Sequence, residues 1–573
     1  MWGLLAIVFG CATIVCAQSE PAEKSSDANT KGTITGRVVD ENGQPMPNTQ
    51  VSISGYGGSA RQVVTSDADG KFRATDLSRM SYLISASSPA YVARPRDPDL
   101  DPIGYYHIGD SVRLEMMKGG VITGSVTRAN GEPIVSISVY AYMIRDYRGQ
   151  APRYSSPVGR QQTDDRGIYR IYGLASGTYI VAAGGGRASG YQVNPFAMDA
   201  VTFAPSSTRD TAAEVSVNAG EEDSGVDIRY RDEPGHTVSG TVANANAADQ
   251  EQGFTIMLTS VLNGLEQTAA SAYQPGGTHG FMFTGVADGD YQIIAQTYSP
   301  AGGWSLSESQ RVRVKEADIT GIELTAKPLA SISGAVVLED SKVAECQGKR
   351  RPVFGEIVIG AYHNEKNVAK DQPQSIWGLG GPLTPDGQGN FTLRNLAAGQ
   401  YRFITRPSAK YWYLKSIAWP STSKAAQANR PLDAARNWTT VKTADKLSGL
   451  NITFAAGAAS LQGRIETSAG KLPPRAFVYL APAEPEQRED ILRYFVSLAA
   501  EDGTFDLGNI PPGSYWVIAR AATTSDTNMQ SKMRLPDEAE LRAKILHDGE
   551  AAQNQAELKP CQNLTAYKLP FRE

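Results

Sequence analysis

The chain has 573 residues, with 41% hydrophobic and 20% charged residues and a net charge of −5. This length exceeds what one hydrophobic core supports, and the composition excludes a wholly disordered chain. The near-neutral charge gives no electrostatic basis for binding nucleic acid or an anionic membrane. The 56 Gly, 32 Pro and 25 Tyr residues favour many turns and short strands.

The N-terminal segment predicts export. Residues 1–17, MWGLLAIVFGCATIVCA, carry no charged side chain and end in small residues, which predicts a signal peptide cleaved near Ala17. A basic start is missing, so a buried strand, a membrane anchor and lipid attachment at Cys11 or Cys16 are the alternatives. Residues 18–31 are polar and predict a flexible leader. We expect the mature chain to be secreted, periplasmic or at the cell surface, without a transmembrane segment.

A short pattern recurs five times along the rest of the chain. In each copy a glycine has an apolar residue two positions before it and another two positions after it. These opening glycines are Gly36, Gly124, Gly240, Gly334 and Gly463. Each copy predicts a short alternating strand that bends or bulges at the glycine.

A longer block follows each opening strand, and the spacing of residues within the block is the same in all five copies. It starts at an anchor residue, with an aromatic residue two positions later, an aliphatic residue seven later and a tyrosine twelve later. The anchors are Gly70, Gly167, His279, Gly389 and Gly503, and the tyrosines are Tyr82, Tyr179, Tyr291, Tyr401 and Tyr515. Turn residues before two alternating segments predict a β-hairpin, which needs further strands packed against it. The first copy has Met80 where the others have glycine, so its turn is expected to differ.

The repeated pattern resembles the carboxypeptidase regulatory-like family. The first copy matches best, the second and fifth match well, and the third and fourth match more loosely, so that the copies together cover most of residues 32–522. The resemblance lies in GRVVDENGQPMPNTQVSI from Gly36 and SDADGKFRATDLSRMSYLISA from Ser66, and it implies a transthyretin-like β-sandwich. It is specific for fold and weak for function, because such modules are attached to many different proteins.

Together, the repeats and the resemblance predict an all-β protein. We expect a tandem array of about five Ig-like or transthyretin-like β-sandwich modules with a short C-terminal helix. The expected modules are residues 32–118, 119–232, 235–327, 329–456 and 458–522. The tail, residues 523–573, is expected to hold a helix near Pro536–Gln555, with a break at Gly549 as an open alternative.

The sequence contains no recognisable catalytic set. A zinc carboxypeptidase needs His-x-x-Glu and a later histidine, but His547 and Glu550 are followed by none. Nucleophile-elbow, phosphate-loop and dinucleotide motifs are also missing. The carboxylates of Asp67, Asp69 and Asp164–Asp165 are expected to form turns, with calcium binding as the alternative. We expect no enzyme activity, no metal and no cofactor.

An aromatic cluster in the fourth copy is the candidate ligand site. It contains Tyr411, Trp412, Tyr413 and Trp419. Alternate residues of a strand face opposite sides, so at least one ring is expected to meet solvent or a loop, where it could stack on a sugar. The alternative is that these rings fill the core or a seam between modules. The weaker cluster Tyr105-Tyr106-His107 has the same two interpretations.

Two cysteines remain after the predicted cleavage. In an oxidising compartment Cys346 and Cys561 are expected to form a disulfide that ties the tail to the fourth module, with two unrelated thiols as the alternative.

We expect a non-catalytic exported binding or scaffold protein whose ligand is a carbohydrate or another cell-envelope component. The alternatives are a structural spacer or accessory subunit for an outer-membrane or secreted protein, and, less favoured, an accessory part of a peptidase.

Overall fold

A computed structural model describes most of the chain outside its N-terminal segment. The described residues are 31–56, 60–94, 104–147, 149, 158–185, 195–208, 211–244, 253–262, 265–275, 280–299, 303–364, 381–421, 432–467, 473, 476–500, 502–521 and 539–571. The predicted signal peptide, all of the predicted leader except Lys31, and the anchor His279 lie outside them. The described strands form five β-sandwich modules in sequence, called modules 1 to 5 below; in module 3 all eight strands are hydrogen-bonded into one continuous sheet.

The strands of the first three modules follow one another along the chain. Module 1 has β1 Gly32–Val39, β2 Gln50–Gly55, β3 Arg61–Thr65, β4 Lys71–Leu77, β5 Tyr82–Ser87, β6 Tyr91–Ala93 and β7 Ser111–Lys118. Module 2 has β8 Gly120–Thr127, β9 Ser138–Asp146, β10 Gly159–Gln162, β11 Ile168–Leu174, β12 Gly177–Ala183, β13 Thr202–Phe203, β14 Val215–Val217, β15 Glu222–Ser224 and β16 Ile228–Arg229. Module 3 has β17 His236–Asn244, β18 Gly253–Leu262, β19 Leu265–Pro275, β20 Gly280–Val286, β21 Gly289–Ser299, β22 Gly303–Ser307, β23 Gln310–Val314 and β24 Ile319–Pro328.

The last two modules also contain short helices. Module 4 has β25 Ala330–Glu339, η3 Ala344–Cys346, η4 Phe354–Glu356, β26 Ile359–His363, β27 Asn390–Leu396, β28 Gly399–Thr405, β29 Trp412–Trp419, β30 Leu432–Asp433, β31 Thr439–Val441 and β32 Lys446–Ala456. Module 5 has β33 Ala459–Glu466, β34 Ala476–Pro482, η6 Pro485–Gln487, η7 Ile491–Arg493, β35 Phe495–Leu498, β36 Thr504–Ile510, β37 Gly513–Ala521, α2 Ala539–Ala552, β38 Gln555–Leu558 and β39 Asn563–Pro570.

All five modules share one strand arrangement. The first strand pairs antiparallel with the strand that carries the anchor aromatic, and parallel with the last strands of the same module. In module 1, β1 lies between β4 and β7. The same arrangement recurs around β8, β17, β25 and β33. The strand that begins at or just before the repeated tyrosine lies in the part of the sandwich that faces this first strand, where it pairs with β2, β9, β18, β26 or β34.

The opening glycines are required by a close backbone approach. A Cβ atom at any of the five would lie 2.0 to 2.3 Å from a backbone carbonyl oxygen of the segment alongside. At three of them the ring of the anchor aromatic also comes within 2.7 Å of that position, and at Gly124 the hydroxyl oxygen of Tyr169 lies 3.1 Å away. This space admits no side chain, so the glycine sets the distance between the first strand and its parallel neighbour.

The repeated tyrosines form the same hydrogen bond in every module. Each hydroxyl donates to the carbonyl oxygen four residues earlier. The acceptors are Ser78, Ala175, Ala287, Ala397 and Pro511, at 2.6 to 2.9 Å. Burial raises the pKa of the four tyrosines with a resolved shift, Tyr82, Tyr179, Tyr401 and Tyr515, so these hydroxyls stay protonated and can donate. The tyrosine therefore ties the second strand of the hairpin to the turn before it.

Removing one of these hydroxyls is expected to weaken one module. Tyr179→Phe should lower the free energy of unfolding of module 2 by about 1 kcal/mol, because the carbonyl of Ala175 loses its donor. Tyr172→Phe is the matched control, since Tyr172 is 48% exposed in the same module. Hydrogen–deuterium exchange of β12 checks the prediction. Equal exchange in the two variants would show that the bond is dispensable.

A further repeated feature lies six residues after each anchor. Asp76, Gly173, Gly285, Asn395 and Asn509 all have φ between 58° and 72°. Next to each, the pairing with the first strand of the module shifts register. Asp, Asn and Gly are the residues that tolerate this left-handed conformation, so a β-bulge is encoded at the same place in all five modules.

The C-terminal tail completes module 5. Strand β38 pairs with β37, and β39 pairs in parallel with β33, so the tail supplies the last strands of the fifth sandwich. The predicted helix is present as α2, and it continues through Gly549, which packs against Trp516. Cys346 and Cys561 form a disulfide with a Cα–Cα distance of 5.4 Å, which joins module 4 to this tail.

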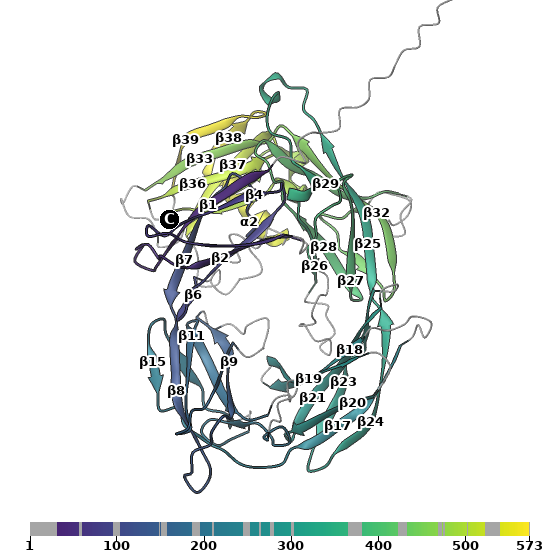
Figure 1. The fold of residues 1–573 in the computed structure, drawn as a ribbon. Coiled ribbons are helices and arrows are strands. Elements are labelled where there is room, and N and C mark those ends of the chain that lie inside the picture. Colours follow the sequence, from purple (N-terminus) through teal and green to yellow (C-terminus); the bar gives the residue numbers. More distant parts are fainter. Residues whose placement is uncertain are drawn as a thin grey trace, which may run out of the picture.

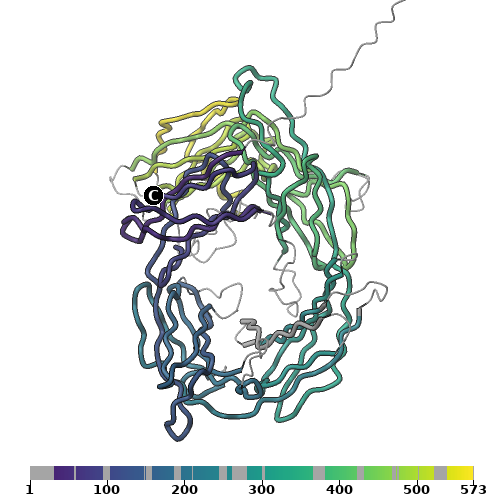
Figure 2. The backbone as a smooth tube through the Cα atoms, in the orientation of Figure 1, coloured from purple at the N-terminus to yellow at the C-terminus, as the bar shows by residue number. Residues whose placement is uncertain are grey.

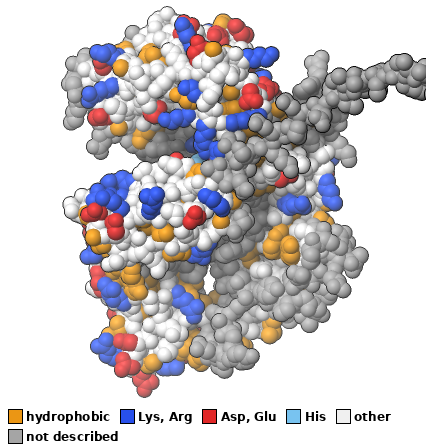
Figure 3. Space-filling view, turned by 45° about the horizontal axis from the view of Figure 1, so that its top comes forward, with side chains coloured by type: hydrophobic (Ala, Val, Ile, Leu, Met, Phe, Trp, Pro, Cys, Tyr) orange, Lys and Arg blue, Asp and Glu red, His pale blue; other side chains and the backbone are white. Residues whose placement is uncertain are grey.

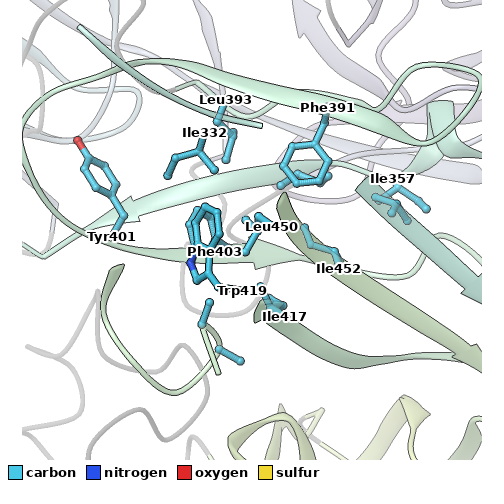
Figure 4. Close-up of a cluster of buried hydrophobic side chains, with 14 of the residues drawn as sticks. Ile332, Ile357, Phe391, Leu393, Tyr401, Phe403, Ile417, Trp419, Leu450 and Ile452 are labelled. Atoms are coloured by element: carbon cyan, nitrogen blue, oxygen red, sulfur yellow. The ribbon is translucent and has the colours of Figure 1, made fainter. Parts of the chain in front are cut away.

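The modules are arranged in a ring rather than in a rod. Figure 1 shows modules 2 and 3 at the bottom of the ring and modules 1, 4 and 5 in its upper half, where hydrogen bonds join module 1 to module 4. The backbone trace follows the same path, from purple through teal to yellow (Figure 2). Each module retains its own buried core. In module 4, Phe403, Trp419 and Leu450 meet at the centre of that core (Figure 4).

Candidate functional site

The two tryptophans predicted to stack on a sugar are in the core. Trp419 is 0% exposed and its Nε1 donates to Thr439 Oγ1 at 3.0 Å. Trp412 is 3% exposed and its Nε1 donates to the carbonyl oxygen of Arg350 at 3.1 Å. Strand β29 pairs antiparallel with β32. One face of β29 packs on the core of module 4, and β36 and η7 of module 5 pack near the strand. Neither indole can therefore form a sugar platform.

The two tyrosines of the predicted cluster, Tyr411 and Tyr413, are half-buried. Tyr411 has φ of 67°, its carbonyl oxygen accepts from the backbone N–H groups of Gly457 and Ala458, and the ammonium of Lys349 lies 4.7 Å from its ring centre. Burial raises the pKa of Tyr413. The structure thus does not bring the four side chains onto one exposed surface, because the tryptophans are in the core of module 4 and the tyrosines are half-buried.

The weaker cluster, Tyr105 to His107, lies where module 1 meets module 4. The rings of Tyr105 and Tyr56 contact edge to face at 4.9 Å. His107 Nε2 is 3.3 Å from the carbonyl oxygen of Glu356 in module 4. These residues therefore belong to a contact between modules.

The carboxylates of the repeated turns are used by the backbone. Asp67 Oδ1 accepts from the N–H groups of Asp69 and Lys71, and Asp164 Oδ1 accepts from those of Arg166 and Ile168. The Ile168 N–H is the largest cause of the lowered pKa of Asp164. These turns explain the carboxylates without a calcium ion. Among the described residues no group of three or more His, Cys, Asp or Glu side chains could hold a metal.

A groove between modules 4 and 5 is the best candidate for a binding site. Its volume is about 1310 Å³, which is above the range of about 300–1,000 Å³ that is typical of small-molecule sites and leaves room for an extended ligand. Module 4 contributes β28 and part of β29, and module 5 contributes β35, β36 and β39. Strands β35 and β36 are each at the edge of their own sheet. The groove therefore follows two sheet edges rather than a loop cluster.

The lining combines apolar and polar groups. The half-buried rings of Tyr362, Phe495 and Tyr567 line it, and burial raises the pKa of the Tyr567 hydroxyl, which keeps it protonated. Thr405 is 7% exposed, and its hydroxyl has no hydrogen-bond partner among the described residues. A buried hydroxyl that lines a groove without a partner is a feature that a polar ligand would satisfy.

The charged residues of the groove are mostly basic. Four are basic and two acidic: Arg402, Arg406, Arg464 and Lys568 against Glu466 and Asp506. Lys568 pairs with Glu466 at 3.0 Å. Arg406 and Arg464 are exposed at the rim. Across the face in Figure 3, acidic and basic side chains are interspersed, so any preference for an anion would be local to the groove.

The two walls of the groove are held in place by specific contacts. Asn509 Nδ2 donates to the carbonyl oxygens of Ala409 and Trp412, at 2.7 and 2.6 Å. Arg436 pairs with Glu489 at 2.5 Å, and Ile491 of module 5 is part of module 4's core. The groove is thus preorganised by direct contacts between modules 4 and 5.

Sequence reasoning missed the groove because its residues are distant in the chain. Tyr362, Phe495 and Tyr567 belong to three different strands of two modules, and only Phe495 has another Phe, Tyr or Trp residue, Tyr494, next to it in the sequence. The repeat predicts the strands, but it does not predict how neighbouring modules pack.

Comparisons with known proteins identify one segment. Residues 33–102 match the family model for the carboxypeptidase regulatory-like domain, so module 1 contains such a domain. No curated protein sequence matches the chain. No helix in the described parts of the chain is both long and apolar enough to cross a membrane.

Three solved structures are similar at low identity. The Bacillus anthracis TIE protein is 14% identical over 52% of this chain and 51% of its own, with a TM-score of 0.14. The minor pilin GBS52 of Streptococcus agalactiae is 11% identical over 35% and 95%, with a TM-score of 0.19. A Streptococcal ancillary pilin is 10% identical over 52% and 100%, with a TM-score of 0.16. The chain thus spans about half the length of the first of these, and such low TM-scores carry no functional inference.

Proposed function

We propose that the chain is an exported, non-catalytic scaffold that binds an extended carbohydrate in the groove between modules 4 and 5. The observation that carries the proposal is the groove itself, with half-buried rings along its walls and basic groups at its rim. Flat rings stack on the apolar faces of sugars, and guanidinium groups pair with carboxylates. A glycan that carries uronic acids fits both properties.

Export is supported by two independent features. The apolar segment of residues 1–17 has the composition of a signal peptide. The disulfide between Cys346 and Cys561 fits an oxidising compartment. A closed arrangement of modules weighs against the alternative of an extended spacer, because module 1 turns back onto module 4 instead of continuing a rod.

The proposal predicts selective loss of binding in groove variants. Tyr362→Ala and Arg406→Ala should each weaken binding of a uronic-acid oligosaccharide about 5- to 10-fold, as expected when one stacking or charged contact is lost. Tyr147→Ala is the control, since Tyr147 is 51% exposed in module 2, away from the groove. Titration calorimetry with a panel of neutral and acidic oligosaccharides measures the effect.

Two outcomes would count against the proposal. One is a lack of binding to every glycan of the panel at millimolar concentration. The other is an equal loss for the groove variants and for Tyr147→Ala. Binding of neutral glycans alone would keep the site but remove the role of the basic rim.

A further inference from the structure

One loop of module 4 contacts three modules. This bridging loop, residues 340–358, connects β25 and β26 and carries η3 and η4. The corresponding loop of module 1 spans only residues 40–49, and that of module 2 spans residues 128–137. Module 4 thus has additional chain at the place where modules 1, 4 and 5 meet.

At its first half the bridging loop is fixed to module 5. Cys346 is 8% exposed and is bonded to Cys561, which lies in the turn between β38 and β39. Four residues later the carbonyl oxygen of Arg350 accepts from Trp412 Nε1 at 3.1 Å. The disulfide and this hydrogen bond fix the loop relative to the seam between modules 4 and 5.

At its second half the same loop holds module 1. The backbone N–H of Ser81 donates to the carbonyl oxygen of Gly355 at 3.2 Å, and the Ser81 hydroxyl donates to that of Glu356 at 2.9 Å. The Arg79 guanidinium lies 3.4 Å from the carboxylate of Glu356, with side-chain exposures of 8% and 0%. Outside the loop, the Tyr56 hydroxyl also bonds to the carbonyl oxygen of Pro382.

The part of module 1 that contacts the bridging loop is the turn at Arg79–Ser81, which differs from the corresponding turns of the other modules. Modules 2 to 5 have glycine at the position of Met80, and a Cβ on Gly355 would come within 3.1 Å of the carbonyl oxygen of Arg79. In module 1 the turn is therefore shaped to meet the bridging loop. The departure seen in the sequence lies at the point where the ring closes.

The closing contact is polar and only partly satisfied. One carboxylate oxygen of Glu356 is shared by Arg79 and Arg350, and the other has no partner among the described residues. A space of about 230 Å³ lies beside the contact, lined among others by Ser81, His107 and Glu356. A buried ion pair offsets its desolvation only when its geometry is kept, so small shifts of the loop would weaken it strongly.

We propose that the Cys346–Cys561 disulfide is a redox-sensitive lock that keeps the ring closed. A dithiol reductant would supply two electrons and two protons, cleave the S–S bond to two thiols and itself become a disulfide. The bridging loop would then lose its covalent attachment to module 5. The Arg79–Glu356 pair would lose its fixed position, and module 1 would separate from module 4 while all modules stay folded.

The test compares the solution shape of the full chain in both redox states. Small-angle X-ray scattering of the oxidised chain should match the closed ring, and reduction with a dithiol should produce a more extended particle. Cys346→Ser combined with Cys561→Ser should have the same effect without reductant. Arg79→Leu should open the ring even when the disulfide is intact, with a closed-to-open ratio reduced about 100-fold, as is typical of breaking a buried ion pair. Lys342→Ala, in the exposed start of the loop, is the control and should stay closed.

The outcomes separate the lock from the contact. If Arg79→Leu opens the ring but reduction and the double serine variant do not, the contact is real and the redox lock is refuted. If none of them opens it, the proposal is refuted as a whole. A loss of the far-ultraviolet circular dichroism signal on reduction would also overturn it, because the lock requires folded modules in both states.

Discussion

Gly334→Ala is expected to disrupt module 4. The added Cβ would lie 2.0 Å from the carbonyl oxygen of Leu450 and 2.7 Å from the ring of Phe391. Because the carbonyl belongs to a paired backbone, β25 and β32 would have to separate, at a cost of about 3 kcal/mol or more. Hydrogen–deuterium exchange of β32, together with scanning calorimetry of the full chain, measures the loss.

Gly387→Ala provides the matched control in the same module. A Cβ at Gly387 meets no heavy atom within 4 Å, so this variant should unfold like the parent chain. If the two variants had equal transition temperatures, the close approach at the opening glycine would not be a constraint. The same comparison could be made at Gly463, where the space is filled by the carbonyl oxygen of Tyr567.

Trp419→Ala is expected to destabilise module 4 by about 3–5 kcal/mol, the usual cost of removing a large buried aromatic side chain. The indole is completely buried, packs edge to face against Phe403 at 6.3 Å and satisfies the Thr439 hydroxyl. The variant leaves a cavity and also an unpaired buried hydroxyl. Thermal unfolding followed by exchange in β28 and β29 checks the size of the effect.

Tyr411→Ala separates this structural role from a ligand-binding role. Tyr411 is only half-buried, so its removal should cost much less stability than the removal of Trp419. Should Trp419→Ala retain parental stability and lose only ligand binding, the indole would belong to a site and not to the core.

The fold could be predicted from the sequence because the repeat encodes it locally. The opening glycine, the anchor aromatic and the tyrosine twelve residues after the anchor each fix a backbone approach or a hydrogen bond within one module. The residue types also indicate the positive φ at the position six residues after each anchor. This position is occupied by Asp76, Asn395 and Asn509 in three copies and by Gly173 and Gly285 in the other two.

The site could not be predicted in the same way. Trp412 and Trp419 are seven residues apart, which would place them on opposite faces of a regular strand. A β-bulge in β29 between Leu414 and Ser416 changes the alternation, and both indoles enter the core of module 4. The groove and the ring depend on contacts between distant segments, such as Asn509 with Ala409 and Ser81 with Glu356. No spacing within one repeat carries information about these contacts.

The parallel pairing of first and last strands has a consequence for how such a chain can grow. The chain enters each sandwich at one end and leaves it at the opposite end, because the first and last strands run parallel. For example, β24 ends at Pro328 and β25 of the next module begins at Ala330. Copies can therefore be appended by in-frame duplication without rebuilding any unit. The ion pair between Arg79 and Glu356, however, closes the ring. Inserting or deleting one module would separate these two residues, so selection for a closed ring would keep the number of modules constant.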